Sequence, residues 1–436
     1  MKITKKLMIF MLITSMVFSF AALSLTGCDN GTTGGGGSDN GDGTCIHEWN
    51  AYTQTTLPTC TTAGIKTRTC KLCSVTDTVT ETGDTALDHD YQWVSTATET
   101  TDGIKAEVCS RNSAHTRNSS TAYATGTAGL TFGAGTIGGD VPTNYAYVHS
   151  FTPSGGFNGN LYIPKYWLNT FTDEYYPVTE IDADAFKDKT TITNVTFPNT
   201  LKKIGANAFN GCTGIQELKI PNSVTEIGVG AFRYCSALTN MTIPFVGEKA
   251  NGTGVTVFGH LFDTSSTDHQ YYVPATLEEV IITGGESIAN YAFYYCINIK
   301  SIVIPASVKS IGNTAFAKCT SLVGVVILAG SELETIGATA FMDCTSLARV
   351  VIPGNEISIA ISSFRNCSLL GAIYFGGEDS SAWNAITIDN TSNFNDYFLN
   401  IVNGNTGKVY YYSETRPGTN GTHWAWGPSG TPMVWN

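Results

Sequence analysis

The fold is decided by a stretch that occurs twice in the second half of the chain. Residues 215–237 read IQELKIPNSVTEIGVGAFRYCSA, and residues 299–321 read IKSIVIPASVKSIGNTAFAKCTS. Isoleucine, proline, valine, glycine, phenylalanine and cysteine recur at the same offsets, so both segments are copies of one structural unit. Partial copies begin at Ile192, Leu238, Leu277, Leu322, Leu347 and Leu370. A unit of this length cannot bury its apolar face alone, and the repetition therefore predicts a solenoid in which stacked coils share one core.

The apolar positions of one copy predict the cross-section of a coil. Leu218 and Ile220 alternate with outward residues, as in a strand, and stacking such strands gives a parallel β-ladder on one face. Pro221 lacks an N–H and marks the end of that strand. A second extended run follows, with Val224 and Ile227 inward. The alanine-phenylalanine pair and the cysteine then lie on the return side, where we expect a short helical turn, so the predicted solenoid is β-rich with short helical turns.

Stacking of the copies predicts two columns of side chains. The phenylalanines form one buried spine, made of Phe186, Phe209, Phe232, Phe293, Phe316, Phe341 and Phe364. The cysteines form a parallel column, made of Cys212, Cys235, Cys296, Cys319, Cys344 and Cys367. Adjacent coils are about 5 Å apart, which is compatible with disulfide bridges, but free cysteine packs as a small buried hydrophobe. We interpret the column as buried thiols, with one or two bridges as the alternative, and not as a metal site, because no histidine shares it.

At this point the chain resembles a known family. The series Ile-Pro-x-Ser-Val-x-x-Ile-Gly-x-x-Ala-Phe-x-x-Cys, complete in residues 220–235 and 304–319, is similar to the BspA-type leucine-rich repeat of bacterial surface proteins. The resemblance implies a leucine-rich repeat solenoid, adhesion or protein–protein contact at the cell surface, and no catalytic residues. We place the solenoid at residues 178–375. Two copies depart from the pattern, because an insertion occupies about residues 245–274 and Leu328 stands where a proline belongs.

The amino terminus predicts export and a lipid anchor. Lysines precede an uncharged apolar run that ends at Leu25, which is the composition of a secretory signal. The four residues that end at Cys28 read Leu-Thr-Gly-Cys and resemble a bacterial lipobox, whose cysteine is diacylated through its sulfur. An uncleaved membrane helix is the alternative, because the run is nearly long enough to span a bilayer. We expect a signal peptide at 1–27, a diacylglycerol-modified Cys28 that anchors the chain to the bacterial envelope on its outer surface, and a flexible glycine-rich tether at 28–44.

Residues 45–124 are predicted to form a separate Cys/His-rich β module of two degenerate copies. The first copy contains Cys45, His47, Cys60, Cys70 and Cys73. A C-x-x-C knuckle with histidine or cysteine upstream is how short β-rich modules hold zinc. We therefore interpret His47, Cys60, Cys70 and Cys73 as ligands of a structural zinc ion, with Cys45 as the substitute for His47. Oxidising conditions outside the cell favour disulfides among the same cysteines, and redox catalysis is a third option.

Composition and motifs argue against several other functions. The net charge is −12 and no basic stripe exists to release counterions, so nucleic-acid binding is disfavoured. The tether lacks the lysine and helix of a phosphate-binding loop, and no Gly-x-Ser-x-Gly elbow is present. His260, Asp263 and His269 lie among Gly, Ser, Thr and Asn in the insertion, and we expect them in a surface loop. We therefore do not expect an enzyme.

One outward position of the first ladder predicts a binding surface. The residue before the last inward one is polar at Thr196, Lys219 and Thr242. It is apolar in the next five copies, at Ile281, Val303, Val326, Val351 and Tyr374, which we call the apolar column. Exposed apolar stripes, here about 20 Å long at strand spacing, usually mark an interface. We interpret the column as the binding site for a host or neighbouring-cell macromolecule, a protein rather than a glycan; the alternative is that β-branched residues simply suit strands.

Caps are predicted at both ends of the solenoid, because its terminal coils need cover. Residues 125–177 would cap the amino-terminal end. Residues 376–436 are rich in tyrosine and tryptophan, and we expect strands between Lys408 and Trp435, joined by turns at Pro417-Gly418 and at Gly427 to Gly430. The alternative for this region is sugar stacking on exposed tryptophans, which would make the chain a carbohydrate-binding module.

Overall fold

The computed structural model describes residues 50–56, 65–69, 76–80, 91–110, 112–137, 143–263, 269–328, 330–354, 356–378, 386–389, 396–404, 407–413, 423–426 and 432–434. These residues belong to two compact units. The first takes in the described residues up to Gln92 together with Glu107–Arg117, and the second contains Trp93–Ala106 and Asn118–Asn436. The solenoid lies in the second unit.

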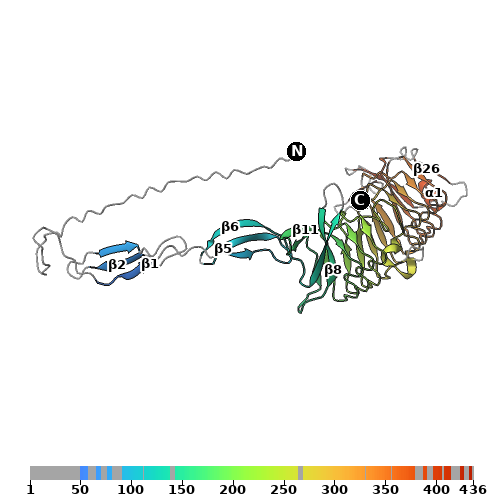
Figure 1. The fold of residues 1–436 in the computed structure, drawn as a ribbon. Helices are drawn as coiled ribbons and strands as arrows, with labels where there is room; N and C mark the ends of the chain where they lie inside the picture. Colours follow the sequence, from blue (N-terminus) through green and yellow to red (C-terminus); the bar gives the residue numbers. More distant parts are fainter. Residues whose placement is uncertain are drawn as a thin grey trace, which may run out of the picture. The chain divides into compact units, whose positions relative to one another are not determined.

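Two three-stranded sheets precede the solenoid in the sequence (Figure 1). The first has the order β1 (Thr53–Thr56), β2 (Ile65–Thr69), β3 (Thr76–Thr80), and its neighbouring strands are antiparallel. The second has the order β4 (Tyr91–Ser95), β5 (Gly103–Cys109), β6 (Asn112–Ala122). Two sheets of the same strand order thus fall within residues 45–124, where the sequence predicts two copies of one module.

The first ladder of the solenoid confirms the predicted β-rich coil. It starts with the parallel pair β9 (Asn160–Tyr162) and β12 (Asn194–Thr196). A ten-stranded sheet follows in the order β14 (Glu217–Lys219), β16 (Asn240–Ile243), β17 (Glu279–Ile282), β19 (Ser301–Ile304), β21 (Gly324–Ile327), β23 (Arg349–Ile352), β25 (Ala372–Phe375), β27 (Lys408–Tyr412), β28 (His423–Trp426), β29 (Pro432–Val434). All neighbours are parallel except β28 and β29, so each coil contributes its strand in the same direction.

The second ladder is split into two sheets, and most of its strands within the repeats are only two residues long. One contains β15 (Glu226–Ile227), β13 (Lys203–Ile204), β11 (Glu174–Ile181), β8 (Thr143–Phe151) and β7 (Leu130–Ile137), with β10 (Tyr166–Asn169) beside β11. The other contains β18 (Ser287–Ile288), β20 (Ser310–Ile311), β22 (Thr335–Ile336), β24 (Ile357–Ile359) and β26 (Ile386–Ile388). The break between β15 and β18 coincides with the insertion.

The outermost strand of the first of these sheets is β7, which runs antiparallel to β8. A Cβ added to Gly133 or Gly135 of β7 would collide with the ring of Tyr147 or Tyr145 of β8. The glycines therefore let the aromatic rings lie flat over the edge strand. This hairpin covers the amino-terminal end of the second ladder, within the segment for which the sequence predicts a cap.

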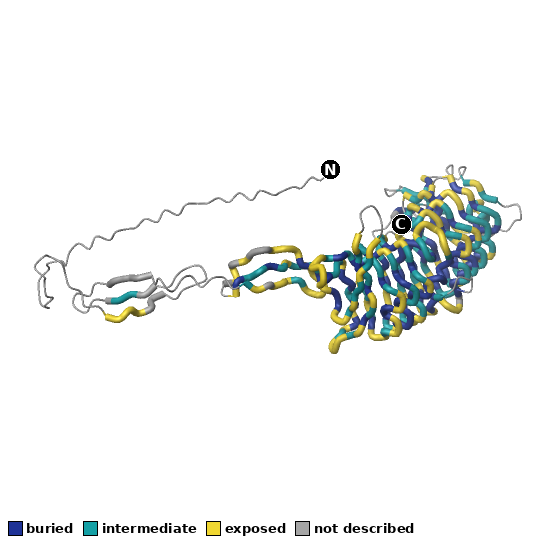
Figure 2. The backbone as a smooth tube through the Cα atoms, viewed as in Figure 1, coloured by how far each residue is buried: buried dark blue, intermediate teal, exposed yellow. Residues whose placement is uncertain are grey.

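The phenylalanine spine is confirmed. All seven predicted rings are fully buried. Successive rings stack with centroids 4.7 to 5.7 Å apart from Phe186 to Phe232 and again from Phe293 to Phe364, on either side of the insertion. The buried positions follow the inside of every coil (Figure 2). The spine is longer than predicted, because Phe258 of the insertion stacks on Phe293 and Phe398 of helix α1 (Asp396–Val402) stacks on Phe364, both at 4.7 Å.

The solenoid also extends further than the sequence predicts. Beyond residue 375, strand β26 joins the second ladder, α1 supplies Phe398 to the spine, and β27 joins the first ladder. One more coil therefore follows the predicted boundary. The strands β27, β28 and β29 lie in the region where strands are predicted between Lys408 and Trp435, whereas the two predicted turns fall outside the described residues.

The predicted helical turn on the return side is wrong. In each copy the residues two before and two after the phenylalanine have positive φ, for example Thr314 (59°) and Lys318 (60°) around Phe316. Such residues cannot continue a right-handed helix. They turn the backbone so that the N–H of Phe316 donates to the oxygen of Ala340 in the next coil, at 2.8 Å. The return side therefore consists of turns that are hydrogen-bonded from coil to coil.

A substitution at Tyr291 tests this left-handed geometry. Tyr291 has a φ of 59° and a side chain that is 46% exposed. Tyr291→Gly and Tyr291→Ala remove the same ring, but alanine keeps the Cβ that costs about 1 to 2 kcal/mol in this region of conformational space. We expect the glycine variant to have the higher free energy of unfolding, by about 1 kcal/mol, measured by urea denaturation.

The matched control is Val229, which is similarly exposed and does not have a positive φ. There the usual order applies, and Val229→Ala should be more stable than Val229→Gly because glycine gains more freedom in the unfolded chain. The same order at both positions would contradict the left-handed assignment.

Candidate functional site

The predicted apolar column exists as a register column of the first ladder. Ile281 lies opposite Val303, and Val303 lies opposite Val326. At the carboxyl-terminal side Val351 lies opposite Tyr374, which in turn lies opposite Tyr410. The column therefore continues one strand further than predicted, onto the aromatic segment after the last recognisable repeat. It is polar at Thr242, the register partner of Ile281.

The exposure of the column is lower than predicted. Ile281, Val303, Val326 and Tyr374 are half-buried. The expectation that Val351 faces solvent is wrong, because only 4% of this residue is exposed. Its strand β23 lies between β21 and β25, so the branched side chain of Val326 and the ring of Tyr374 flank it in the column. The surface that remains accessible consists of parts of side chains, spread over neighbouring strands.

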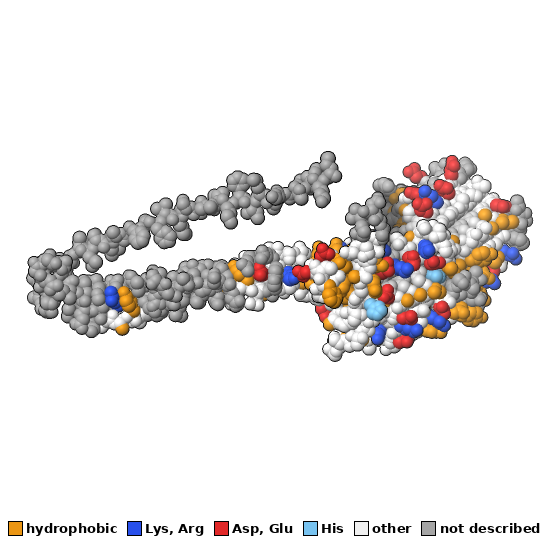
Figure 3. Space-filling view, viewed as in Figure 1, with side chains coloured by type: hydrophobic (Ala, Val, Ile, Leu, Met, Phe, Trp, Pro, Cys, Tyr) orange, Lys and Arg blue, Asp and Glu red, His pale blue; other side chains and the backbone are white. Residues whose placement is uncertain are grey.

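A row of polar side chains runs beside the column, two residues earlier on the same face. It includes Glu279 and Ser301, which are register partners. The amide of Asn240 donates to Oε2 of Glu279 at 3.0 Å, which holds this carboxylate in place. Further along, a Cβ added to Gly324 would lie 3.4 Å from Cγ and Nε of Arg349, so the arginine side chain covers the glycine. Charged groups of both signs are interspersed on the face of this unit seen in Figure 3.

The aromatic end of the column packs against the core. The ring of Tyr374 stacks on Tyr410 at 5.2 Å and meets Trp424 edge-on at 5.8 Å. Trp424 is only 1% exposed, and its Nε1–H donates to the oxygen of Phe375 at 2.8 Å. Burial, with a further contribution from Tyr410, raises the pKa of Tyr374. Trp424 is therefore not available to stack on a sugar, and Trp383 and Trp435 lie outside the described residues.

The cysteine column consists of buried thiols, as predicted. All six cysteines are free and buried. Five of the six thiols donate to the backbone oxygen of the spine phenylalanine in the preceding coil, as Cys319 does to Phe293 and Cys344 to Phe316, both at 3.1 Å. Burial raises the pKa of Cys319 to about 12. The column is thus a set of neutral hydrogen-bond donors that satisfies the carbonyls of the spine.

Two expectations about the histidines of the insertion are wrong: that they lie in a surface loop, and that no histidine shares the cysteine column. His260 and His269 are buried rather than exposed in a surface loop. Nδ1 of His269 lies 3.4 Å from Sγ of Cys296, so a histidine does reach the cysteine column. The reason is that the 3-10 helix η1 (Phe258–Phe262) folds inward and replaces a return segment: the N–H of Phe232 donates to the oxygen of Leu261 in η1. A second short 3-10 helix, η2 (His269–Tyr271), then brings His269 to the thiol.

The Cys296–His269 pair has the composition of a catalytic dyad but not its environment. Cys296 and His269 are both almost fully buried, and burial raises the pKa of Cys296 well above its ordinary value. A neutral, inaccessible thiol is a poor nucleophile. The third residue considered, Asp263, forms an ion pair with Arg233 instead. In the part of the chain that the structure describes, no group of three or more His, Cys, Asp or Glu residues could hold a metal ion.

The predicted sites near the amino terminus are not described by the structure. Cys28, His47, Cys60, Cys70 and Cys73 all lie outside the described residues, so the lipid attachment and the zinc or disulfide alternatives stay predictions. A search of the described residues finds no helix with the length and apolarity needed to cross a membrane.

Comparison with known proteins agrees with the repeat architecture. The family model described as "BspA type Leucine rich repeat region" matches in six copies at residues 170–259 and 271–400, together just over half of the chain. No curated protein matches.

Several solved leucine-rich repeat proteins are similar at about 20% identity. A Treponema pallidum leucine-rich repeat protein is 21% identical over 52% of this chain and 82% of its own, with a TM-score of 0.28. A leucine-rich repeat protein of Bacteroides ovatus is 20% identical over 60% of this chain and 76% of its own, with a TM-score of 0.27. A leucine-rich cell surface protein of Faecalibacterium prausnitzii is 21% identical over 62% and 98%, with a TM-score of 0.23. At such TM-scores the surfaces of these proteins cannot be transferred to this chain.

Alkylation tests the state of the cysteine column. At about pH 8, near the ordinary thiol pKa, we expect iodoacetamide to leave Cys319, Cys344 and Cys367 unmodified in the folded protein, because the thiols are buried and protonated. In denaturant without a reductant the same three cysteines should be fully modified, as read by peptide mass spectrometry. Residues that react only after a reductant is added would show that disulfides link the coils.

Proposed function

Because this chain belongs to the BspA-type leucine-rich repeat family, a family of surface protein–protein interaction in general, we propose that it is a bacterial surface protein that binds a partner protein on the first ladder of its solenoid. The observation that carries the proposal is the apolar column. Its members occupy one register position in consecutive strands, from Ile281 to Tyr374. The partner would be a host or neighbouring-cell macromolecule.

The geometry of the column suits a protein partner. Neighbouring strands are about 4.8 Å apart, so half-buried apolar groups from successive coils form a nearly flat strip. A polar row that includes Glu279 and Arg349 runs beside the strip, and interfaces commonly combine an apolar centre with a polar rim. A glycan would instead need exposed aromatic faces, and at the aromatic end Trp424 is buried. These observations favour a protein over the carbohydrate-binding alternative.

The anchor belongs to the same proposal. A diacylated Cys28 would hold the mature chain at the membrane surface, and residues 28–44, which are rich in glycine, would let the solenoid reach a partner. Export to the outer surface and adhesion follow from this arrangement. The zinc site proposed at His47, Cys60, Cys70 and Cys73 would have a structural role, because a module of about 40 residues has too small a core to be stable unaided.

The variant Cys28→Ser separates the lipid anchor from an uncleaved membrane helix. If the wild-type protein is lipid-anchored, we expect the variant to lack the additional mass of the acyl chains. The variant should then move from the detergent phase to the aqueous phase if its signal peptide is still removed, or accumulate as a precursor if it is not. The measurement is detergent phase separation followed by intact-mass analysis. A wild-type protein that retains residues 1–27 and carries no acyl mass would contradict the lipid anchor.

Charges introduced in the column test the binding face. Because Val303 and Val326 are half-buried, lysine stems can lie along the face while the ammonium groups reach water. We expect the double variant Val303→Lys, Val326→Lys to bind its partner at least about tenfold more weakly, a loss of about 1.4 kcal/mol or more, with little change in melting temperature. Binding is measured on an array of purified extracellular proteins and on intact cells.

Two further variants serve as controls for this experiment. Thr196→Lys places the same charge at the polar end of the same position and should leave both binding and melting temperature unchanged. Val351→Lys should lower the melting temperature, because it buries a charge that has no partner. Unchanged capture by the double variant would show that the apolar column is not the binding face.

A further inference from the structure

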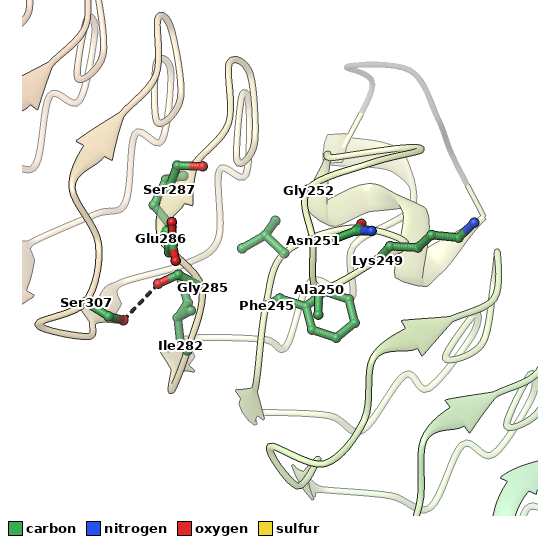
Figure 4. Close-up of a pocket in the computed structure, with 13 residues that line it drawn as sticks. Phe245, Lys249, Ala250, Asn251, Gly252, Ile282, Gly285, Glu286, Ser287 and Ser307 are labelled. Atoms are coloured by element: carbon green, nitrogen blue, oxygen red, sulfur yellow. Dashed lines mark hydrogen bonds between the residues drawn. The ribbon is translucent and has the colours of Figure 1, made fainter.

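The insertion opens a groove in the side of the solenoid. The groove has a volume of about 550 Å³ and lies between the segment Phe245–Gly252 and the coil that contains β18. Figure 4 shows Ala250 and Lys249 on one wall and Glu286 and Ser287 on the other. Its floor is apolar, since Phe245, Ile282 and Ile288 are buried core residues that also line the groove.

The groove coincides with the break in the second ladder. β15 is the last strand of one sheet and β18 is the first strand of the next. Between them, the segment Phe245–Gly252 pairs with β15: the N–H of Ile227 donates to the oxygen of Glu248 at 2.9 Å, and the N–H of Ala250 donates to the oxygen of Thr225 at 3.0 Å. This contact is antiparallel, as the Glu226–Lys249 bridge shows. The inserted segment therefore does not continue the parallel ladder to β18.

The edge of β18 that faces the groove has unused backbone donors. In the next coil, the two N–H groups that flank β20 donate to the preceding coil, from Lys309 to Glu286 and from Gly312 to Ile288, both at 2.8 Å. The equivalent donors around β18 are the N–H groups of Glu286 and Ala289. Within the described ranges, no protein oxygen accepts a hydrogen bond from either of them. The edge is thus open at both positions where the ladder normally continues.

The inserted segment is held away from this edge by its own hydrogen bonds. The N–H of Glu248 donates to the oxygen of Val255 at 2.7 Å. In return the N–H of Val255 donates to the carboxylate of Glu248 at 3.1 Å, and this bond is the main reason why the pKa of Glu248 is lowered. The carboxylate is therefore charged and engaged at neutral pH. The wall of the groove is a closed hairpin rather than a strand that has slipped out of register.

We propose that the groove binds an extended segment of a partner protein, which adds a parallel strand to the open edge of β18. The two donors would bond to carbonyls two residues apart on that segment, as the equivalent donors of the next coil do with Glu286 and Ile288. Carbonyls at this separation point the same way on an extended chain. Strand addition to an exposed sheet edge is an established mode of peptide recognition.

The lining of the groove agrees with such an occupant. Alternate side chains of an added strand would point to the apolar floor at Phe245 and Ile288 and outward to the polar rim. The rim carries Lys249, Glu286 and Ser307, whose hydroxyl already donates to the oxygen of Gly285 at 2.8 Å. This site is distinct from the apolar column. Evidence against binding at the apolar column would therefore not contradict binding in the groove, and the reverse also holds.

Amide hydrogen exchange of the full chain tests whether the edge is open. We expect the N–H groups of Glu286 and Ala289 to exchange at least about a hundredfold faster than those of Lys309 and Gly312, their equivalents in the next coil, because only the latter have acceptors. Equal protection of the two pairs would overturn the proposal, since another part of the chain would then occupy the edge.

A peptide with the sequence around β20 tests whether the open edge of β18 accepts an added strand. The probe is a capped peptide with the sequence of residues 307–313, Ser-Val-Lys-Ser-Ile-Gly-Asn, which presents carbonyls to the following coil in the structure. We expect it to slow exchange at Glu286 and Ala289 at least about tenfold without changing exchange at Lys309 and Gly312. A peptide of the same composition in scrambled order should have no effect.

Two variants locate the peptide in the groove. Ala250→Trp fills the groove from the hairpin wall and should abolish the effect of the peptide, whereas Thr253→Trp, on the same hairpin but outside the lining, should not. The variant Val303→Lys, Val326→Lys should bind the peptide normally, which separates this site from the apolar column. No change in exchange with peptide, or protection that persists in Ala250→Trp, would overturn the proposal.

Discussion

The structure depends on the hydrogen bonds that join one coil to the next around the spine phenylalanine. At Phe316 the N–H donates forward to Ala340, and the carbonyl accepts the thiol of Cys344 in the following coil. The ring meanwhile stacks on its neighbours at 5.1 and 5.2 Å. Each of these contacts links adjacent coils, so a single coil has almost no stabilisation of its own and the core exists only in the stack. The residues two before and two after each phenylalanine adopt left-handed backbone conformations. These conformations are unfavourable for residues other than glycine, and they let the N–H and the carbonyl of the phenylalanine point along the solenoid axis.

The insertion shows which of these contacts are obligatory. Phe258 of the inserted segment belongs to the buried core and stacks on Phe293. His269 supplies a partner for the thiol of Cys296, which does not donate to a spine carbonyl as the other five thiols of the column do. The second ladder, by contrast, is allowed to break between β15 and β18. Core columns are filled by substitute residues because an empty position would leave a cavity, whereas an unpaired edge at the surface can be solvated. Openings in this solenoid therefore arise in the ladders and not in the spine.

The repeat pattern predicts what is identical in every coil and fails where one coil differs. The spine, the buried thiols and the register of the apolar column all follow from offsets in residues 215–237 and 299–321, and all three are observed. His269, Phe258 and Phe398 were missed as core residues because they replace repeat positions from segments that lack the pattern. The left-handed turns were mistaken for helix because tyrosine, threonine and lysine hold several of the positions where glycine or asparagine would have indicated a positive φ. The burial of Val351 depends on the size of the side chains in the adjacent strands. The spacing of the repeats does not predict that size.

The two candidate surfaces recognise a partner in different ways. Along the apolar column, each strand from β17 to β25 has a paired strand on both sides. Discrimination there rests on half-buried side chains, and the accessible part of each side chain contributes only part of the free energy of a fully buried one. Useful affinity there requires contact with several strands at once, which favours a partner as long as the column. At β18 the backbone is paired with β20 on one side and open on the side of the groove. A short segment would therefore gain hydrogen bonds there regardless of its side chains, and would gain selectivity only from the floor at Phe245 and Ile288.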